Sequence, residues 1–293
     1  MLGIVGTIPS EEFPLVSGHI TLSGDCILIA GHEIPVNRGT AALMAAAVAT
    51  SEALGVAPPC GYLAGDIGRG KGSRMLYKCL TEELPGSHLQ TLTFHYLQPI
   101  VHWHNRLQAA LTALPVRPYL IADAGYMYVA KMSGKASLYD LFTPDVGELA
   151  FLADEEAPHP FYTRGFILHD EVSTPELIAR AYRHGNAARN LIVKGNQDYL
   201  ADRSGILETV DSPVEEALEA MGGTGDTLTG IVSALIDAGM NIRSAAPIAM
   251  KANRYAGHLT RPTPATQVME IIHHIPAALA DIMHKERTRT SGM

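Results

Sequence analysis

Apolar runs of strand length alternate along this chain with longer segments in which apolar residues recur at helical spacing. Strands followed by helices, with continuous apolar strands, are typical of a mostly parallel sheet that helices cover on both faces. The pattern therefore predicts an α/β fold. The predicted strands are CILIAG at 26–31, CGYLAG at 60–65, PYLIADAG at 118–125 and LIVKG at 191–195, and the predicted helices occupy 40–55, 72–84, 176–190 and 229–239.

Length and composition indicate one folded domain. The chain has 293 residues, of which 47% are hydrophobic and 18% are charged. This length lies within the range of a single large α/β domain, and this composition allows a sizeable buried core. We predict one domain over residues 1–293, with a polar C-terminal tail, 285–293, that is flexible.

Charge and cysteine content exclude several classes of partner. The formal net charge is −8, so the chain would repel a polyanion such as nucleic acid. The N-terminus lacks the basic residues of a signal peptide, and the apolar stretch at 39–51 is too short to cross a bilayer. The three cysteines have neither metal nor redox spacing. We expect a cytoplasmic protein with no nucleic-acid or membrane partner, whose alanine-rich helices allow a homo-oligomer.

Open parallel sheets bind ligands beyond the carboxyl ends of their strands. A lysine that ends a buried strand needs an anion or water, so Lys194 is expected to pair with a phosphate or with a nearby carboxylate. Asp123 has two alternatives as well, a substrate or magnesium role or the capping of a turn. The candidate residues selected by this rule are Gly31, Gly65, Asp66, Asp123, Asp145, Lys194, Gly195 and Asn196.

The stretch GGTGDTLTG at 222–230 places glycines and hydroxyl residues around one carboxylate, directly before an apolar helix. The first N–H groups of a helix have no partner within it, and glycine lets an anion approach them closely. Gly223, Thr224 and Gly225 are therefore predicted to bind an oxyanion. Asp226 either serves as a general base for a substrate hydroxyl or caps the helix.

This stretch resembles the anion-hole motif of the ribokinase-like superfamily, in which the Asp is the catalytic base. Further stretches resemble the superfamily in the expected order, and the resemblance extends from about residue 25 to about residue 280. It implies a ribokinase-like three-layer fold, with Asp226 as the catalytic base and Gly223, Thr224 and Gly225 as the anion hole. The further stretches are LIADAGYMYVAKMSG, DLFTPDVGELAFLAD, LIVKGNQDYLADRSG and PIAMKANRYAG.

The same resemblance implies roles for the other candidates and supplies the cofactors. It implies that ATP or ADP and Mg²⁺ bind, with Asp145 and Glu148 at the metal. The implied nucleotide-binding residues are Lys194, Gly195, Asn196 and Asn253, and the implied substrate-binding residues are Gly31, Gly65, Asp66 and Asp123.

Two branches of the superfamily compete for the function. The main hypothesis is an ATP- and Mg²⁺-dependent kinase that transfers the γ-phosphate to a hydroxyl of a small metabolite, of sugar or vitamin-precursor type. The alternative is an ADP/ATP-dependent NAD(P)H-hydrate dehydratase, which Gly147-Glu148 and Leu228-Thr229-Gly230 favour. A nucleotide-binding protein without catalysis is the third hypothesis, and Asp226 argues against it because binding alone does not need a carboxylate beside a phosphate.

The chain departs from both branches. Vitamin-type kinases carry a proline where this chain has Ala124, and they have Asn where it has Asp145. The dehydratases carry His at Asp145, and they carry NPG.AT where this chain reads EEALEAM. The sequence therefore does not fix the substrate.

Two other patterns are weaker. GDIGRGKGS at 65–73 approaches a P-loop, but Gly72 follows Lys71 where the motif requires a hydroxyl residue. His95, His102 and His104 lack nearby carboxylates, so we expect them at the surface or at an interface rather than at a metal.

Overall fold

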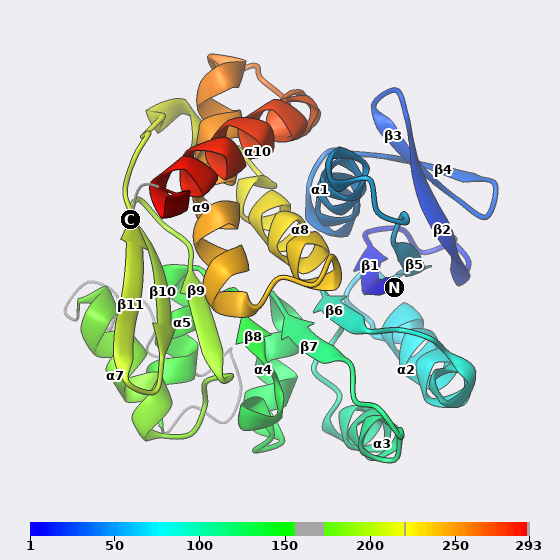
Figure 1. Ribbon diagram of the computed structural model, residues 1–293. Helices are drawn as coiled ribbons and strands as arrows, with labels where there is room; N and C mark the ends of the chain where they lie inside the picture. The colour runs from blue at the N-terminus through cyan, green and yellow to red at the C-terminus, as the bar shows by residue number, and fades with distance from the viewer. Residues whose placement is uncertain (156–172, 220, 292–293) are drawn as a thin grey trace. The chain divides into compact units, whose positions relative to one another are not determined.

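The computed structural model describes residues 1–155, 173–219 and 221–291. These residues form two compact units, each assembled from separate stretches of sequence (Figure 1). Unit 1 consists of Met1–Leu2, Ser17–Gly61 and Val210–Met293, and unit 2 consists of Gly3–Val16 and Tyr62–Thr209. The single domain expected from the length stays a prediction, and we describe each unit by itself.

Unit 2 contains a mostly parallel sheet. Its strands, some of which extend by one or two residues into unit 1, are β1 (Leu2–Ile8), β5 (Cys60–Gly65), β6 (Thr91–His95), β7 (Tyr119–Ala122), β8 (Leu141–Phe142), β9 (Asn190–Val193), β10 (Asp198–Asp202) and β11 (Gly205–Val210). Strands β6, β7, β8 and β9 pair in parallel, and β10 pairs antiparallel with β9. The strand order within the unit is β11-β10-β9-β8-β7-β6-β1-β5. The prediction of a mostly parallel sheet is confirmed.

Helices follow most strands of unit 2 and pack beside one another as a layer. Consecutive helices are in contact, α2 with α3, α3 with α4, α4 with α5 and α5 with α7 (Figure 1). This is the arrangement that the alternation of apolar strands and amphipathic helices favours, because each helix buries its apolar face on the sheet. Their bounds are α2 (Lys71–Glu83), α3 (Val101–Thr112), α4 (Gly125–Met132), α5 (Val146–Ala153) and α7 (Thr174–Arg183), with 3₁₀ turns at Leu84–Gly86 and Ala136–Leu138.

Unit 1 combines an antiparallel ribbon with four helices. Strand β2 pairs antiparallel with β3, and β3 pairs antiparallel with β4. Among the helices, α1 packs against α8 and α10, and α9 packs against α8 and α10. The bounds are β2 (Val16–Ser23), β3 (Cys26–Ile29), β4 (His32–Pro35), α1 (Gly39–Leu54), α8 (Thr224–Asp237), α9 (Ile242–Thr260) and α10 (Val268–Ser291), with a 3₁₀ turn at Glu216–Leu218.

One expectation about the strands was wrong, and the expected flexibility of the C-terminal tail stays a prediction. The run CILIAG was expected in a parallel sheet, but β3 is the middle strand of the antiparallel ribbon. The tail expected to be flexible from residue 285 is helical through Ser291, and residues 292–293 lie outside the described residues. Within the described residues, no helix combines the length and the hydropathy that a membrane crossing requires.

Candidate functional site

The N-terminus of α8 carries the predicted oxyanion site in unit 1. Gly223 is the residue that precedes the helix, and its φ of 106° lies in the left-handed region that favours glycine. A glycine at this position has no side chain to accept hydrogen bonds from the first amides of the helix. The amides of the first turn and the helix dipole therefore present partial positive charge at one point.

Asp226 lies in this first turn, and its carboxylate contacts the start of another helix. Its Oδ2 accepts a hydrogen bond of 2.7 Å from the backbone N–H of Gly39, the first residue of α1. Asp226 thus caps α1. Two helix N-termini converge on this carboxylate, and helix dipoles interact favourably with negative charge at this end.

Close packing of α8 on α1 places these groups together. A Cβ added at Gly230 would lie 2.3 Å from the carbonyl oxygen of Leu43, which is far inside van der Waals contact. The backbones of the two helices can approach this closely because residue 230 has no side chain. The second half of the GGTGDTLTG stretch therefore positions α1, and through α1 it positions the Gly39 amide at Asp226.

Asn253, on α9, holds the first turn of α8. Its Nδ2 donates to the carbonyl oxygen of Thr224 at 3.0 Å, and its Oδ1 accepts from Thr227 Oγ1 at 2.6 Å. These two bonds engage both ends of the amide. The predicted nucleotide contact of Asn253 remains a prediction, while the geometry supports a positioning role beside the anion site.

In unit 2, the ends of two parallel strands bring Asp123 and Lys194 together. Lys194 Nζ lies 2.8 Å and 3.0 Å from the two carboxylate oxygens of Asp123, whose Oδ1 also accepts from the Ala124 amide. Asp123 is 1% exposed. Of the two partners considered for Lys194, a carboxylate is therefore observed, and both residues lie at the carboxyl edge of the sheet, as predicted from the strand ends.

Ala124 explains one departure from the kinase pattern. Its φ is 50° with ψ −141°, a conformation that L side chains rarely adopt, and it immediately precedes α4. Proline holds φ near −65° and cannot occupy this position. Backbone strain of this kind clusters at functional sites.

Asp145 and Glu148 form a capping box at the start of α5. Asp145 Oδ1 accepts from the Glu148 amide at 2.7 Å, and Glu148 Oε2 accepts from the Asp145 amide at 2.9 Å. The pKa of the Glu148 carboxyl is raised because the effect of burial outweighs the opposite effect of the nearby Lys194. The box engages one oxygen of each carboxylate, so this donor set is chemically compatible with the Mg²⁺ role that the resemblance implies. That role stays a prediction.

Asp66 satisfies its own loop. Its carboxylate accepts four hydrogen bonds, from the amides of Gly68, Gly70 and Ser73 and from Ser73 Oγ. These bonds hold the pKa of Asp66 below its usual value against the effect of burial. The amides that would cradle a phosphate in a P-loop surround this side chain instead, so the geometry supports a structural role for Asp66. The substrate contact expected of Asp66 stays a prediction.

The glycines expected to bind substrate have structural reasons of their own. A Cβ at Gly65 would lie 2.2 Å from the Ser10 carbonyl oxygen, so this position is restricted by a close backbone approach. Gly31 and Ala30 both have positive φ in the two-residue turn between β3 and β4, which is the requirement of a tight hairpin. Gly31 therefore does not end a parallel strand, and the reason for selecting it was wrong. Gly195 and Asn196 follow β9, where the Gly195 amide donates to Asp198.

Arg38 is a residue that the sequence analysis did not single out. It precedes α1 in an extended conformation, is exposed, and its Nε lies 3.7 Å from where a Cβ of residue 222 would be. Its side chain therefore runs along the glycines before α8. The signal available in the sequence was a basic residue directly before the glycine that begins an alanine-rich helix.

The histidines considered for a metal lie on one helix and one strand. His102 and His104 lie on helix α3. His104 is fully buried, with Nε2 2.8 Å from the Tyr139 hydroxyl and Nδ1 2.9 Å from Ser133 Oγ. His95 is also buried, on β6. The surface placement expected for His95 and His104 was wrong. All three cysteines are free thiols.

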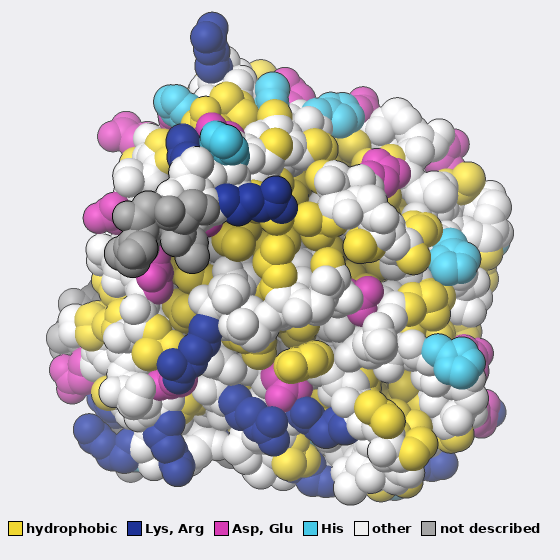
Figure 2. Space-filling model, in the orientation of Figure 1, with side chains coloured by type: hydrophobic (Ala, Val, Ile, Leu, Met, Phe, Trp, Pro, Cys, Tyr) yellow, Lys and Arg dark blue, Asp and Glu magenta, His cyan; other side chains and the backbone are white. Residues whose placement is uncertain are grey.

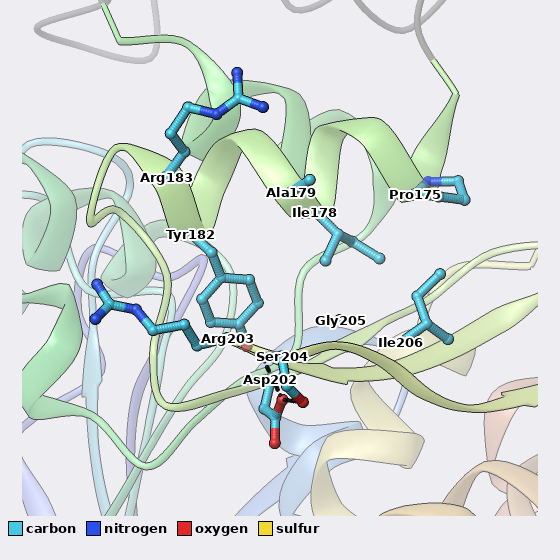
Figure 3. Close-up of a pocket in the computed structure, with 10 residues that line it drawn as sticks. All are labelled: Pro175, Ile178, Ala179, Tyr182, Arg183, Asp202, Arg203, Ser204, Gly205 and Ile206. Carbon is cyan, nitrogen blue, oxygen red and sulfur yellow. Dashed lines mark hydrogen bonds between the residues drawn. The ribbon is translucent and has the colours of Figure 1, made fainter.

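A cavity of about 500 Å³ lies in unit 2 between α7 and the β10–β11 hairpin (Figure 3). Tyr182 and Ile178 line it from the helix, and Arg203, Ser204 and Ile206 line it from the hairpin. None of its lining residues belongs to the candidate site. On the face shown in Figure 2, Lys and Arg side chains are interspersed with acidic and hydrophobic ones.

The parallel α/β sheet, the glycine-rich helix start and the capping carboxylate define a ribokinase-like enzyme. The family model described as NAD(P)H-hydrate dehydratase matches residues 104–277, and the chain belongs to this family. The matched region contains every predicted residue of the catalytic, anion, nucleotide and metal groups. It leaves out the antiparallel ribbon and α1.

A sequence relative and several solved structures resemble the chain over most of its length. The chain is 40% identical over 220 residues to an uncharacterised protein of Methanocaldococcus jannaschii, a match that covers 75% of this chain and 90% of the relative. The structure of the ADP/ATP-dependent NAD(P)H-hydrate dehydratase of Bacillus subtilis, co-crystallized with ATP and Mg²⁺, matches with a TM-score of 0.54 and 15% identity, and the match covers 97% of this chain and 89% of that chain. Pyridoxal kinase from Staphylococcus aureus, in complex with AMP-PCP and pyridoxal, matches with a TM-score of 0.53 and 13% identity, over 87% of this chain and 88% of that chain.

Proposed function

We propose that the protein is an ADP/ATP-dependent NAD(P)H-hydrate dehydratase. The observation that carries the proposal is the family match over residues 104–277, which includes the glycine-rich start of α8 and its Asp226. The order of the two sequence hypotheses is thereby reversed, because the family match favours the dehydratase over the kinase. Nucleotide and Mg²⁺ are the cofactors we expect, as in the Bacillus subtilis structure.

One set of groups can serve both chemistries at their first step. In each reaction a hydroxyl of the substrate attacks a terminal phosphoryl group, and a base must take the hydroxyl proton. Asp226 is the proposed base, and the amides at the start of α8 stabilise the negative charge of the transferring group. In the dehydratase the C–O bond then breaks, phosphate leaves, and a proton lost from the neighbouring ring carbon restores the double bond. Asp145 and Glu148 would hold Mg²⁺.

The direct test is restoration of the reduced nicotinamide. Purified full-length protein is incubated with hydrated NADH and Mg²⁺, with ADP, with ATP or without nucleotide, and the formation of NADH is measured by its absorbance. We expect NADH only when a nucleotide is present. No NADH with either nucleotide, together with a phosphorylated vitamin or sugar from a substrate panel, would establish the kinase instead.

Replacement of Asp226 tests the base. Asn keeps an oxygen that accepts the Gly39 hydrogen bond but cannot take a proton at neutral pH, so Asp226→Asn is expected to lower kcat by about 10²–10⁴-fold. The affinity for ADP should change only severalfold, as measured by calorimetry. An unchanged kcat would remove Asp226 from proton transfer.

A kinase remains the second candidate. The fold it shares with the pyridoxal kinase supports this candidate, since that structure has the same architecture at a similar TM-score. Pyridoxal and related alcohols therefore belong in the substrate panel.

A further inference from the structure

Arg38 brings a fixed positive charge to the glycine turn before α8. Its Cα lies 3.3 Å from where a Cβ of Gly223 would be, and its Cδ lies 3.6 Å from where a Cβ of Gly222 would be. A Cβ at Gly223 would press on the backbone of Arg38, whereas a Cβ at Gly222 would lie in ordinary van der Waals contact with its side chain. The glycine turn and Arg38 are therefore in close contact.

The guanidinium has no protein partner among the residues that the structure describes. No hydrogen bond, ion pair or ring contact engages it in 1–155, 173–219 or 221–291, and the side chain is exposed. Other arginines are paired, as Arg117 and Arg189 are with the buried Asp140. Asp226, the carboxylate at the same turn, is bonded to the Gly39 amide.

Positive charge is thus concentrated at this point of unit 1. The N-termini of α1 and α8 converge there, each contributing partial positive charge, and Arg38 precedes one of them directly. An arginine fork binds phosphate through parallel charge-assisted hydrogen bonds, which a lysine cannot reproduce. A dianionic oxygen ligand complements this set of groups better than a neutral one.

We propose that Arg38 binds the terminal phosphate of the nucleotide and thereby selects for nucleotides over nucleosides. The proposal rests on the proposed function in one respect, that a nucleotide binds at the start of α8. Arg38 lies outside the region that the family model matches, so the family match does not assign this role. The arginine would also neutralise charge on the phosphoryl group while Asp226 accepts a proton beside it.

Three variants of the full-length protein separate charge, fork and packing. Arg38→Met keeps an unbranched stem against Gly222 and removes the charge, and Arg38→Lys keeps the charge and removes the fork. Arg243→Ala is the charge-matched control on α9, ten residues before Asn253 and so about 15 Å away along that helix. Thermal melts without ligand establish that each variant folds.

The measurement is calorimetric affinity for ADP, for inorganic pyrophosphate and for adenosine. We expect Arg38→Met to lower the affinity for ADP and for pyrophosphate by about 10–100-fold, the size of a charge-assisted contact. Arg38→Lys should lower these affinities less, and Arg243→Ala should not change them. Adenosine affinity should not change. Higher salt should weaken ADP binding more in wild type than in Arg38→Met.

The outcomes distinguish this proposal from the proposed function. ADP affinity equal to wild type in Arg38→Met would overturn the role of Arg38, whatever reaction the enzyme performs. An equal loss of adenosine and ADP affinity would overturn it as well, because the arginine would then support the pocket rather than the phosphate. The binding assay contains no hydrated NADH, so the measured affinities do not depend on the outcome of the dehydratase assay.

Discussion

Ala124 shows how a single residue can hold strain beside functional groups. Its amide donates to Asp123, which is paired with Lys194, so the strained backbone fixes the position of a buried carboxylate. A non-glycine residue in such a conformation stores about 1–3 kcal/mol. The sequence pointed to this position as a departure from the proline of related kinases, and the positive φ gives the reason.

Ala124→Gly is expected to stabilise the protein. Glycine relieves the strain at φ 50°, and the extra entropy of the unfolded chain offsets part of the gain, so the net increase in the free energy of unfolding is about 1 kcal/mol. Urea denaturation of the variant and wild type measures it. A decrease in stability would show that the backbone at 124 is not strained.

At the level of single residues, the sequence predicted which side chains gather but not how they pair. Lys194 and Asp123 follow two different strands, and parallel pairing places both at one edge, which the alternation of apolar runs already implied. Their mutual ion pair depends on side-chain reach across β8, which no sequence spacing encodes. Asp66 illustrates the opposite case, because its loop closes on its own carboxylate within eight residues, from Asp66 to Ser73.

At the level of elements, the spacing of apolar residues predicted secondary structure best for helices that are long and buried. The segments at 40–55 and 72–84 correspond closely to α1 and α2, and the strands at 60–65 and 191–195 correspond to β5 and β9. Helix α3 was not among the predicted helices, and it starts only after Pro99. The orientation of the strands could not be predicted either, because an apolar run such as β3 has the same sequence pattern in parallel and antiparallel sheets.

Gly230 tests the importance of the contact between α1 and α8. Gly230→Ala would force a methyl group to 2.3 Å from the Leu43 carbonyl oxygen, so the helices must separate. We expect a loss of about 3 kcal/mol in the free energy of unfolding and a lower kcat, because the Gly39 amide would move from Asp226. The control is Gly86→Ala, where an added Cβ meets nothing within 4 Å and stability should change by less than about 0.5 kcal/mol. Equal stability of the two variants would contradict the packing argument.

At the level of the whole molecule, buried histidine makes stability depend on pH. Burial lowers the pKa of His104 to about 3, whereas the unfolded chain titrates near 6.5. Between these values the unfolded state binds more protons, so stability rises with pH through this window and is lost as pH falls below 6.5. At pH 5 the loss amounts to about 2 kcal/mol.

His104→Gln removes this contribution while offering polar groups to Tyr139 and Ser133. The variant is less stable at neutral pH, yet its stability should decline less than that of wild type between pH 7 and pH 5, as urea denaturation at each pH would reveal. Parallel declines in the two proteins would mean that His104 is not the group that titrates on unfolding.

The division of the chain into units has a consequence for biosynthesis. Unit 1 needs α1 near the beginning of the chain and α8–α10 at its end, and 169 residues lie between Leu54 and Thr224. A ribosome takes on the order of ten to thirty seconds to translate that distance. During this interval the alanine-rich surface of the nascent α1 has no partner helix, and by its end all of unit 2 has been translated. Unit 2, whose sequence lies mainly in the middle of the chain, is therefore the first unit that can fold.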